Sequence, residues 1–180
     1  MTCLNAIATF TNPIKGSVRF HQCSPESDTL VIFDLYNIKP NSINACHIHE
    51  YGDLTEGCKS LGAHLNLENK EHGSIFIDVH NSHTGDLVNN IQSDKNGVAK
   101  FYYIDPRLTL FGNVEESIIG CSVVIHEGQD DYGLGGNAES KKTGNAGGRI
   151  AGSIIGKSKG GDVDSSYLST IPALDYSIYL

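Results

Sequence analysis

Short runs of β-branched and aromatic residues, separated by turn residues, are the feature that most constrains the fold of this 180-residue chain. Branched and aromatic side chains pack well on a pleated sheet, so such runs fit β-strands. Turn-forming pairs fall between them, as at Asn12-Pro13 and Ser24-Pro25. The clearest runs are Val18–Phe20, Thr29–Tyr36, Ser74–Ile77, Val98–Ile104 and Ser122–His126. No amphipathic helical segment exceeds about 12 residues, so we expect an all-β fold, an antiparallel sandwich or barrel.

Length and composition favour one globular domain. A chain of 180 residues buries roughly 70% of its unfolded surface. The net charge of −8 disfavours nucleic acid and an anionic membrane as partners. No apolar run approaches the ~18 residues of a membrane span. Residues 1–5 carry no basic segment before an apolar core, so we expect neither a membrane anchor nor a secretory signal.

Three segments do not fit the strand pattern. Residues 50–86 are dense in histidine, and residues 127–148 are rich in glycine. Long irregular loops are usually functional or disordered, and the histidines favour function. Residues 157–180 begin with Lys-Ser-Lys-Gly-Gly-Asp. We therefore expect a domain of residues 1–156 followed by a C-terminal extension of residues 157–180, solvated and partly disordered.

Histidines are concentrated in one part of the chain. Five of the eight lie between positions 47 and 80, and a sixth is His83. His47 and His49 stand two residues apart in a run that fits a strand, so their side chains point to the same face. Alone, such a pair is more often part of a polar surface. Together with the other histidines it predicts a metal site, because imidazole suits zinc and copper and a mixed set of histidine and aspartate suits zinc.

The cysteines favour a reducing compartment. Their number is odd and no secretory signal is expected, so we predict that most thiols are free. No Cys-x-x-Cys pair is present, which makes a cysteine-based zinc finger a poor fit. The five are Cys3, Cys23, Cys46, Cys58 and Cys121.

The segments around these histidines resemble the Cu/Zn superoxide dismutase family. The run His47–Asp53 resembles the family's copper-site strand. Further matches follow in the family's order across roughly residues 4–156. They are Gly57–Cys58, Gly62–Asn66, His72–Gly73, His83–Leu87, Val124–Glu127, Asp130–Gly133 and Gly144–Arg149. The resemblance implies an eight-stranded antiparallel Greek-key barrel or sandwich, immunoglobulin-like, with two long functional loops.

The resemblance also implies one copper and one zinc ion per chain. The implied ligands are His47, His49, His64 and His126 for copper, and His64, His72, His83 and Asp86 for zinc. The implied reaction is the dismutation of superoxide to oxygen and hydrogen peroxide, a step of antioxidant defence. Copper would change its oxidation state, His64 would bridge the ions and carry a proton, and zinc, which has no redox chemistry, would hold the bridge.

Two assignments need a choice between neighbours. Only His83 is followed three residues later by an aspartate, Asp86, as in the family, so we favour it over His80 and expect His80 on the surface. Asp130 resembles the carboxylate that links a copper-bound to a zinc-bound imidazole and fixes the tautomers. The flanking residues alone leave open that Asp130 merely forms a turn beside Asp131.

Arg149 is the candidate for docking superoxide, because a guanidinium is always charged and offers several donors. By the resemblance, Glu139, Lys142 and Thr143 belong to a charged loop that guides the anion. Exposed charges act over about 8 Å at physiological salt, so a few local cations can outweigh a negative net charge. An ordinary solvated pair is the alternative for Lys141 and Lys142.

Position 152 departs from the family pattern. The family joins the cysteine matching Cys58 to a cysteine three residues after the arginine, and here that position is Gly152. Such a bridge contributes about 2–4 kcal/mol. We predict that Cys58 is a free thiol, although pairing with another of the five cysteines stays open. Dependence on the family's copper chaperone, which oxidises that pair, is therefore doubtful.

The resemblance further implies a cytoplasmic homodimer. Ile119 and Ile154 match apolar interface regions, whereas Lys157 stands where the family has an apolar residue. Two other functions stay open. One is a non-catalytic copper- and zinc-binding protein on the same fold, a buffer or a chaperone-like domain. The other is a zinc-only structural module, which would leave the implied copper ligands without a role.

Overall fold

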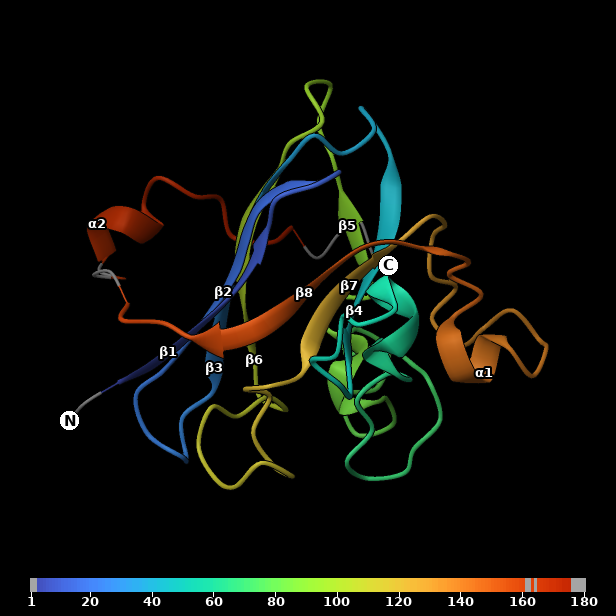
Figure 1. Cartoon of the computed structure of the whole chain (residues 1–180), viewed down its shortest axis with the longest axis horizontal. Helices are drawn as coiled ribbons and strands as arrows, with labels where there is room; N and C mark the ends of the chain where they lie inside the picture. Colours follow the sequence, from blue (N-terminus) through green and yellow to red (C-terminus); the bar gives the residue numbers. More distant parts are fainter. Residues whose placement is uncertain (1–2, 161–162, 164, 176–180) are drawn as a thin grey trace.

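Eight antiparallel strands form one curled sheet in the computed structural model, which describes residues 3–160, 163 and 165–175. The strands are β1 Leu4–Phe10, β2 Lys15–Gln22, β3 Thr29–Tyr36, β4 Ile43–His49, β5 Asn90–Gln92, β6 Ala99–Asp105, β7 Ser122–His126 and β8 Arg149–Lys157. Their spatial order is β5-β4-β7-β8-β1-β2-β3-β6. The sheet is therefore a nearly closed Greek-key barrel (Figure 1), and the predicted all-β class is confirmed.

Successive side chains along β1 and β2 alternate between the inside and the outside of the barrel, and the inward ones fill its core. On β1 the inward residues are the small Ala6 and Ala8, and on β2 they are the larger Val18 and Phe20. Phe33 on β3 stacks on Phe101 of β6 with ring centroids 4.7 Å apart. Burying each large apolar side chain contributes roughly 1.5–3 kcal/mol. This core holds β4 and β7 side by side, with Cys46 opposite Ile125 and His47 opposite Val124.

Two long connections carry short helical turns. The segment after β4 contains η1 Gly57–Leu61 and η2 Thr84–Asp86, and the segment after β7 contains α1 Ser140–Thr143. Both extend from the same side of the barrel (Figure 1). Four of the five predicted strand runs lie in strands, but the prediction of a strand at Ser74–Ile77 is wrong. There the carbonyl oxygen of Ser74 accepts from the N–H groups of Ile77 and Asp78, at 3.0 and 2.9 Å, so the backbone turns on itself.

Part of the C-terminal segment packs on the barrel. Leu30 and Ile32 point outward from β3, and Ile171 covers them. The backbone of Tyr102 on β6 exchanges hydrogen bonds with Pro172 (3.1 Å) and Leu174 (2.8 Å), which covers that sheet edge. Ile171 and Leu174 are 4% and 7% exposed. The prediction that the extension is solvated is therefore wrong for these residues, because they cover an apolar outer face of β3. The division of the chain at residue 156 stays a prediction.

Within the described part of the chain, no helix has the length and apolar character needed to cross a bilayer. The helical pieces include α2, Ser165–Leu168.

Candidate metal centre

Strand geometry brings four histidines together at one end of the barrel. Alternation on β4 turns His47 and His49 to the same side, where both are buried. His126 ends the neighbouring strand β7. His64 enters from the loop after β4, where it forms an isolated bridge with His49 and Leu65 N–H donates to Ile48 O at 2.8 Å. One ring nitrogen from each histidine lies within 4.8 Å of the others.

Each histidine of this four-histidine group turns one ring nitrogen toward the other three. His49 Nδ1 donates to Gly62 O at 3.0 Å and His126 Nδ1 donates to Gly147 O at 3.3 Å. These bonds leave the two Nε2 atoms, 3.3 Å apart, as the ligand atoms. Nδ1 of His47 and Nε2 of His64 are buried and have no hydrogen-bond partner among the described residues. Buried polar atoms are normally paired, so this arrangement fits a bound cation.

A second group shares His64. Asp86 Oδ1 lies 3.1, 2.9 and 3.1 Å from the Nδ1 atoms of His64, His72 and His83. The other carboxylate oxygen of Asp86 accepts from the backbone N–H of His83 at 2.8 Å and of Gly73 at 3.1 Å, which fixes Oδ1 toward the rings. Three imidazoles and one carboxylate are a ligand set that suits zinc.

Asp130 connects the two groups. Its carboxylate accepts from His47 Nε2 at 2.6 Å and from His72 Nε2 at 2.9 Å, and it is 1% exposed. Asn89 Nδ2 donates to the same carboxylate at 3.1 Å. Asp130 therefore does more than form a turn beside Asp131, because its side chain orients one ring of each group.

Burial and charge set the protonation of the rings. Burial lowers the pKa of His64 to about 3 and that of His126 to about 4, and it also lowers the pKa values of His47 and His49. These rings are neutral at physiological pH, which is the state that binds a metal ion.

His72 behaves differently. Burial lowers its pKa, but hydrogen bonds and charge from Asp130 and Asp86 outweigh burial and raise the pKa to about 9. The partner carboxyls are held ionised: although burial raises their pKa values, bonds to the histidines bring the pKa values of Asp86 and Asp130 well below their usual range. Without a cation, a proton on His72 balances this negative charge.

Arg107 supports the second group and was not singled out from the sequence. It forms an ion pair with Asp105 at 2.8 Å, and its guanidinium donates to Ser82 Oγ, His83 O and Leu87 O at 2.9–3.0 Å. These acceptors flank the segment that carries His83 and Asp86. Arg107 lies two residues after Asp105, the last residue of β6. This position alone is a weak sequence signal for its role, because the residues to which Arg107 donates are 20–25 residues away.

An open cleft of about 1180 Å³ leads to the four-histidine group. Four buried histidines line it: His49, His64 and His126 of the four-histidine group and His83 of the second group. The lining also includes the predicted residues Arg149, Glu139, Lys142 and Thr143. Arg149 donates to Cys58 O at 2.7 Å and to Gly62 O. Glu139 accepts from Thr143 Oγ1 at 2.9 Å on α1. Lys142 is exposed on the same short helix.

The remaining predicted residues are placed as follows. His83 lies with Asp86, whereas His80 is exposed. Cys58, Cys46 and Cys121 are free thiols, so the prediction for Cys58 is confirmed. Cys3 and Cys23 form a disulfide, which the expectation of mostly free thiols did not include. Their pairing follows from the register of β1 and β2, which local sequence does not show.

Comparisons with known proteins agree with this geometry. The family described as copper/zinc superoxide dismutase (SODC) matches residues 14–155. A superoxide dismutase [Cu-Zn] of Paramecium bursaria Chlorella virus 1 is 46% identical over 87% of this chain and 80% of its own length. The one from Saccharomyces cerevisiae is 45% identical over 79% of this chain and 90% of its own.

A solved structure, titled a crystal structure analysis of the clock protein EA4, superposes with a TM-score of 0.76. It is 40% identical in sequence, and the match covers 84% of this chain and 93% of that one. The barrel, the two ligand groups that share His64 and these relatives agree: the chain belongs to the copper/zinc superoxide dismutase family.

Proposed function

We propose that this protein dismutates superoxide, converting two superoxide ions and two protons into oxygen and hydrogen peroxide as part of antioxidant defence. The observation that carries the proposal is the pair of buried ligand groups joined by one ring, His64. A protein that only stores metal has no need for two sites that share a side chain. The open cleft reaches three members of the four-histidine group, His49, His64 and His126, and also His83 and an arginine.

The ligand assignments follow from donor chemistry. We assign copper to His47, His49, His64 and His126, and zinc to His64, His72, His83 and Asp86. Copper supplies one-electron redox chemistry when bound, and zinc supplies a fixed positive charge. Asp130 holds the rings of His47 and His72 in one orientation in each half of the reaction.

His64 is the residue that we assign to proton transfer. The residue lines the cleft, and its Nε2 atom is buried and has no hydrogen-bond partner among the described residues. Its Nδ1 atom is held toward Asp86 at 3.1 Å, so the ring keeps its position when a proton arrives at Nε2 or leaves it. A proton held there can be given to the reduced oxygen product, which leaves as hydrogen peroxide.

Arg149 is the residue that we assign to docking the anion. Its two bonds to backbone carbonyl oxygens fix the guanidinium at the cleft wall, where its charge faces the entering superoxide. Glu139, Lys142 and Thr143 shape the charge at the rim from α1. Superoxide has few features to recognise, so charge steering is the effective device for fast capture.

A homodimer in the cytoplasm completes the proposal. Ile154 is 40% exposed and Tyr51 is 54% exposed, and a methyl carbon of Ile154 lies close to Gly52. This apolar surface offers a face for a second copy of the chain. Three free thiols among the five cysteines agree with a reducing compartment.

The dismutation rate of the metal-loaded protein tests the function. We expect fast decay of superoxide in stopped-flow measurements with the wild-type protein, and loss of that decay with zinc retained in His126→Ala. His80→Ala is the matched control, because it removes an exposed imidazole from the same chain. A wild-type protein that binds both metals without accelerating the decay would favour the alternative, a copper and zinc buffer.

A further inference from the structure

Cys3, His21 and Cys23 form a third cluster of metal-binding or reactive side chains, separate from the two metal groups. Figure 1 places the start of β1, the strand that directly follows Cys3, on the opposite side of the molecule from α1. Asn5 pairs with His21 in the register of β1 and β2, and Cys3 and Cys23 stand just beyond the next pair. Alternation puts all four side chains on one face of the two strands.

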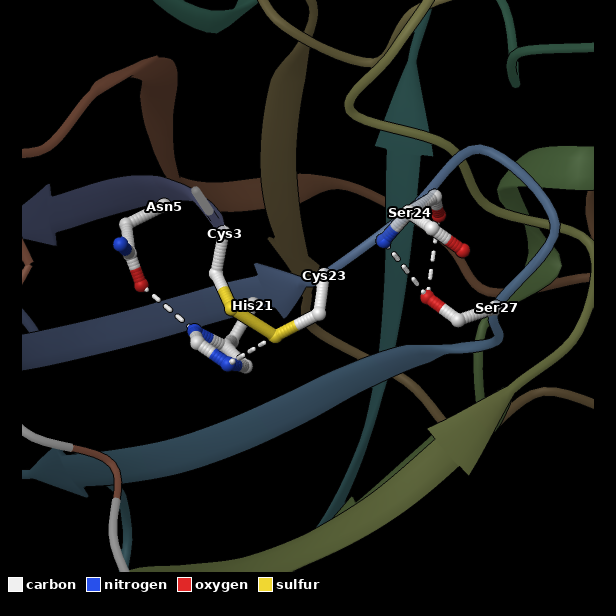
Figure 2. The surroundings of a disulfide bond; sticks show 6 residues. All are labelled: Cys3, Asn5, His21, Cys23, Ser24 and Ser27. Atoms are coloured by element: carbon white, nitrogen blue, oxygen red, sulfur yellow. Dashed lines mark hydrogen bonds between the residues drawn. A yellow bond between two sulfur atoms is a disulfide. The ribbon is translucent and has the colours of Figure 1, made fainter. Parts of the chain in front are cut away.

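A line of contacts runs through this cluster. His21 Nδ1 lies 2.7 Å from Asn5 Oδ1, and His21 Nε2 lies 3.2 Å from Cys23 Sγ (Figure 2). Asn5 Oδ1 is an acceptor, so Nδ1 carries the proton and Nε2 presents a lone pair to the sulfur. In the disulfide neither sulfur carries hydrogen, and the short contact holds no hydrogen bond. A Cys23 thiol at the same distance from the ring would have Nε2 as its hydrogen-bond acceptor.

The neighbouring backbone holds these groups in place. Ser27 Oγ accepts from Ser24 N–H at 3.1 Å, and Ser27 N–H donates to Ser24 O at 3.2 Å, which forms a tight turn directly after Cys23. On the other strand, Ser158 N–H donates to Asn5 O at 2.8 Å. A small cavity of about 230 Å³ opens beside Asn5 and His21. Both cysteines are partly exposed, so a small oxidant can reach them.

We propose that Cys23, activated by His21, and Cys3 form a peroxide-reactive thiol pair that closes into the Cys3–Cys23 disulfide. His21 Nε2 takes the proton of the Cys23 thiol, and the thiolate attacks one oxygen of hydrogen peroxide. The O–O bond breaks, Cys23 becomes a sulfenic acid, and the leaving hydroxide takes the proton from His21 to form water. The Cys3 thiol then attacks the Cys23 sulfur, the S–S bond forms, and a second water leaves.

The sum is two thiols and one hydrogen peroxide giving one disulfide and two water molecules. Asn5 is a positioning residue, since it holds the ring that acts on Cys23. The copper site would supply the peroxide, and that part of the inference rests on the proposed dismutation. The other three cysteines serve as internal references, because Cys46 and Cys121 are buried and burial raises the pKa of Cys58.

The test uses the full metal-loaded chain, reduced with a phosphine and freed of it. Hydrogen peroxide is added, thiols are alkylated at set times, and peptides are identified by mass spectrometry. We expect the Cys3–Cys23 disulfide to form about tenfold or more faster than Cys58 is oxidised, and His21→Gln to slow it by a similar factor. His80→Gln is the matched control and should not slow it. Equal rates at Cys58 and Cys23, or no effect of His21→Gln, would overturn the proposal.

Two further arms keep the result unambiguous. In Cys3→Ser the Cys23 sulfenic acid should persist and be captured by a cyclic 1,3-dione, while superoxide dismutation is unchanged; no captured adduct would contradict the stepwise route. Enzymatically generated superoxide should close the disulfide in the wild-type protein, and catalase should prevent it. Closure with added peroxide but not with superoxide would overturn the link to the copper site and leave the thiol pair standing.

Discussion

The Sγ atom of Cys58 lies 3.1 Å from the point where a Cβ atom on residue 152 would stand, yet residue 152 is Gly152. Across a disulfide, the Cβ atom of one cysteine lies about 3 Å from the sulfur of the other. The loop and strand β8 therefore keep the geometry of a bridge that this chain cannot make. Arg149, through Cys58 O and Gly62 O, provides a non-covalent connection between the same two segments.

Gly152→Cys should form a disulfide with Cys58 and raise the free energy of unfolding by about 2–4 kcal/mol. The new Cβ atom would come within 2.6 Å of Leu61 Cδ1, so the end of that flexible side chain must shift. Peptide mapping without reduction and urea unfolding measure the two effects. Gly152→Ser is the matched control, since it adds a similar side chain without a thiol. Two free thiols in Gly152→Cys, or equal stability of both variants, would contradict the prediction.

Arg107→Met should weaken zinc binding about 10–100-fold. The change leaves the buried carboxylate of Asp105 without its ion-pair partner and removes the donors to His83 O and Leu87 O. The segment that carries two zinc ligands then loses its connection to β6. Competition with a zinc chelator measures the affinity. Arg19→Met, which alters an exposed arginine on β2, should leave the zinc affinity unchanged. Equal zinc affinities for the two variants would refute the role of Arg107.

Arg149→Glu should slow dismutation at least tenfold, in line with the effect of electrostatic steering, while both metals stay bound. The dismutation rate of Arg149→Lys should lie between those of this variant and the wild type. Lysine keeps the positive charge but cannot donate to both carbonyl oxygens in the geometry of the guanidinium. Lys95→Glu makes the same change in net charge at an exposed position outside the cleft. If Lys95→Glu slowed the reaction as much as Arg149→Glu, net charge and not local docking would control the rate.

Zinc binding to the metal-free protein should release about one proton per ion at pH 7.5. His72, whose pKa is raised to about 9, is protonated at this pH and must lose its proton to bind a metal ion. Release should decline as the pH rises through 9. Titration calorimetry in two buffers of different ionisation enthalpy counts the protons. Release of no proton at pH 7.5 would show that Asp86 and Asp130 do not hold a proton on His72.

Local pattern was sufficient to predict much of the fold. The runs Thr29–Tyr36 and Ser122–His126 coincide with β3 and β7, because buried strands are continuous in branched and aromatic residues. Ser74–Ile77 has a similar composition, but its backbone forms a local turn instead of pairing with a described strand. The cover that Ile171 provides for Leu30 and Ile32 depends on contacts across most of the chain.

The same distinction applies to the candidate site. The histidine spacing and the family resemblance predicted the residues that the structure gathers into two groups around His64. Arg107 was missed because its partners are distant in sequence, and the Cys3–Cys23 pair was missed because only the register of β1 and β2 brings it together. In both cases the local sequence shows no distinctive pattern around these residues, and only the tertiary structure brings them to their partners.

We propose that one copper ion, held by four histidines beside zinc, performs the dismutation. The superoxide decay rate of zinc-loaded protein, measured while copper is added in known amounts, tests this. We predict that the rate rises in proportion to bound copper and stops rising at one equivalent per chain. A rate that stays at the level of the uncatalysed reaction after one equivalent has bound would show that this copper site does not catalyse dismutation.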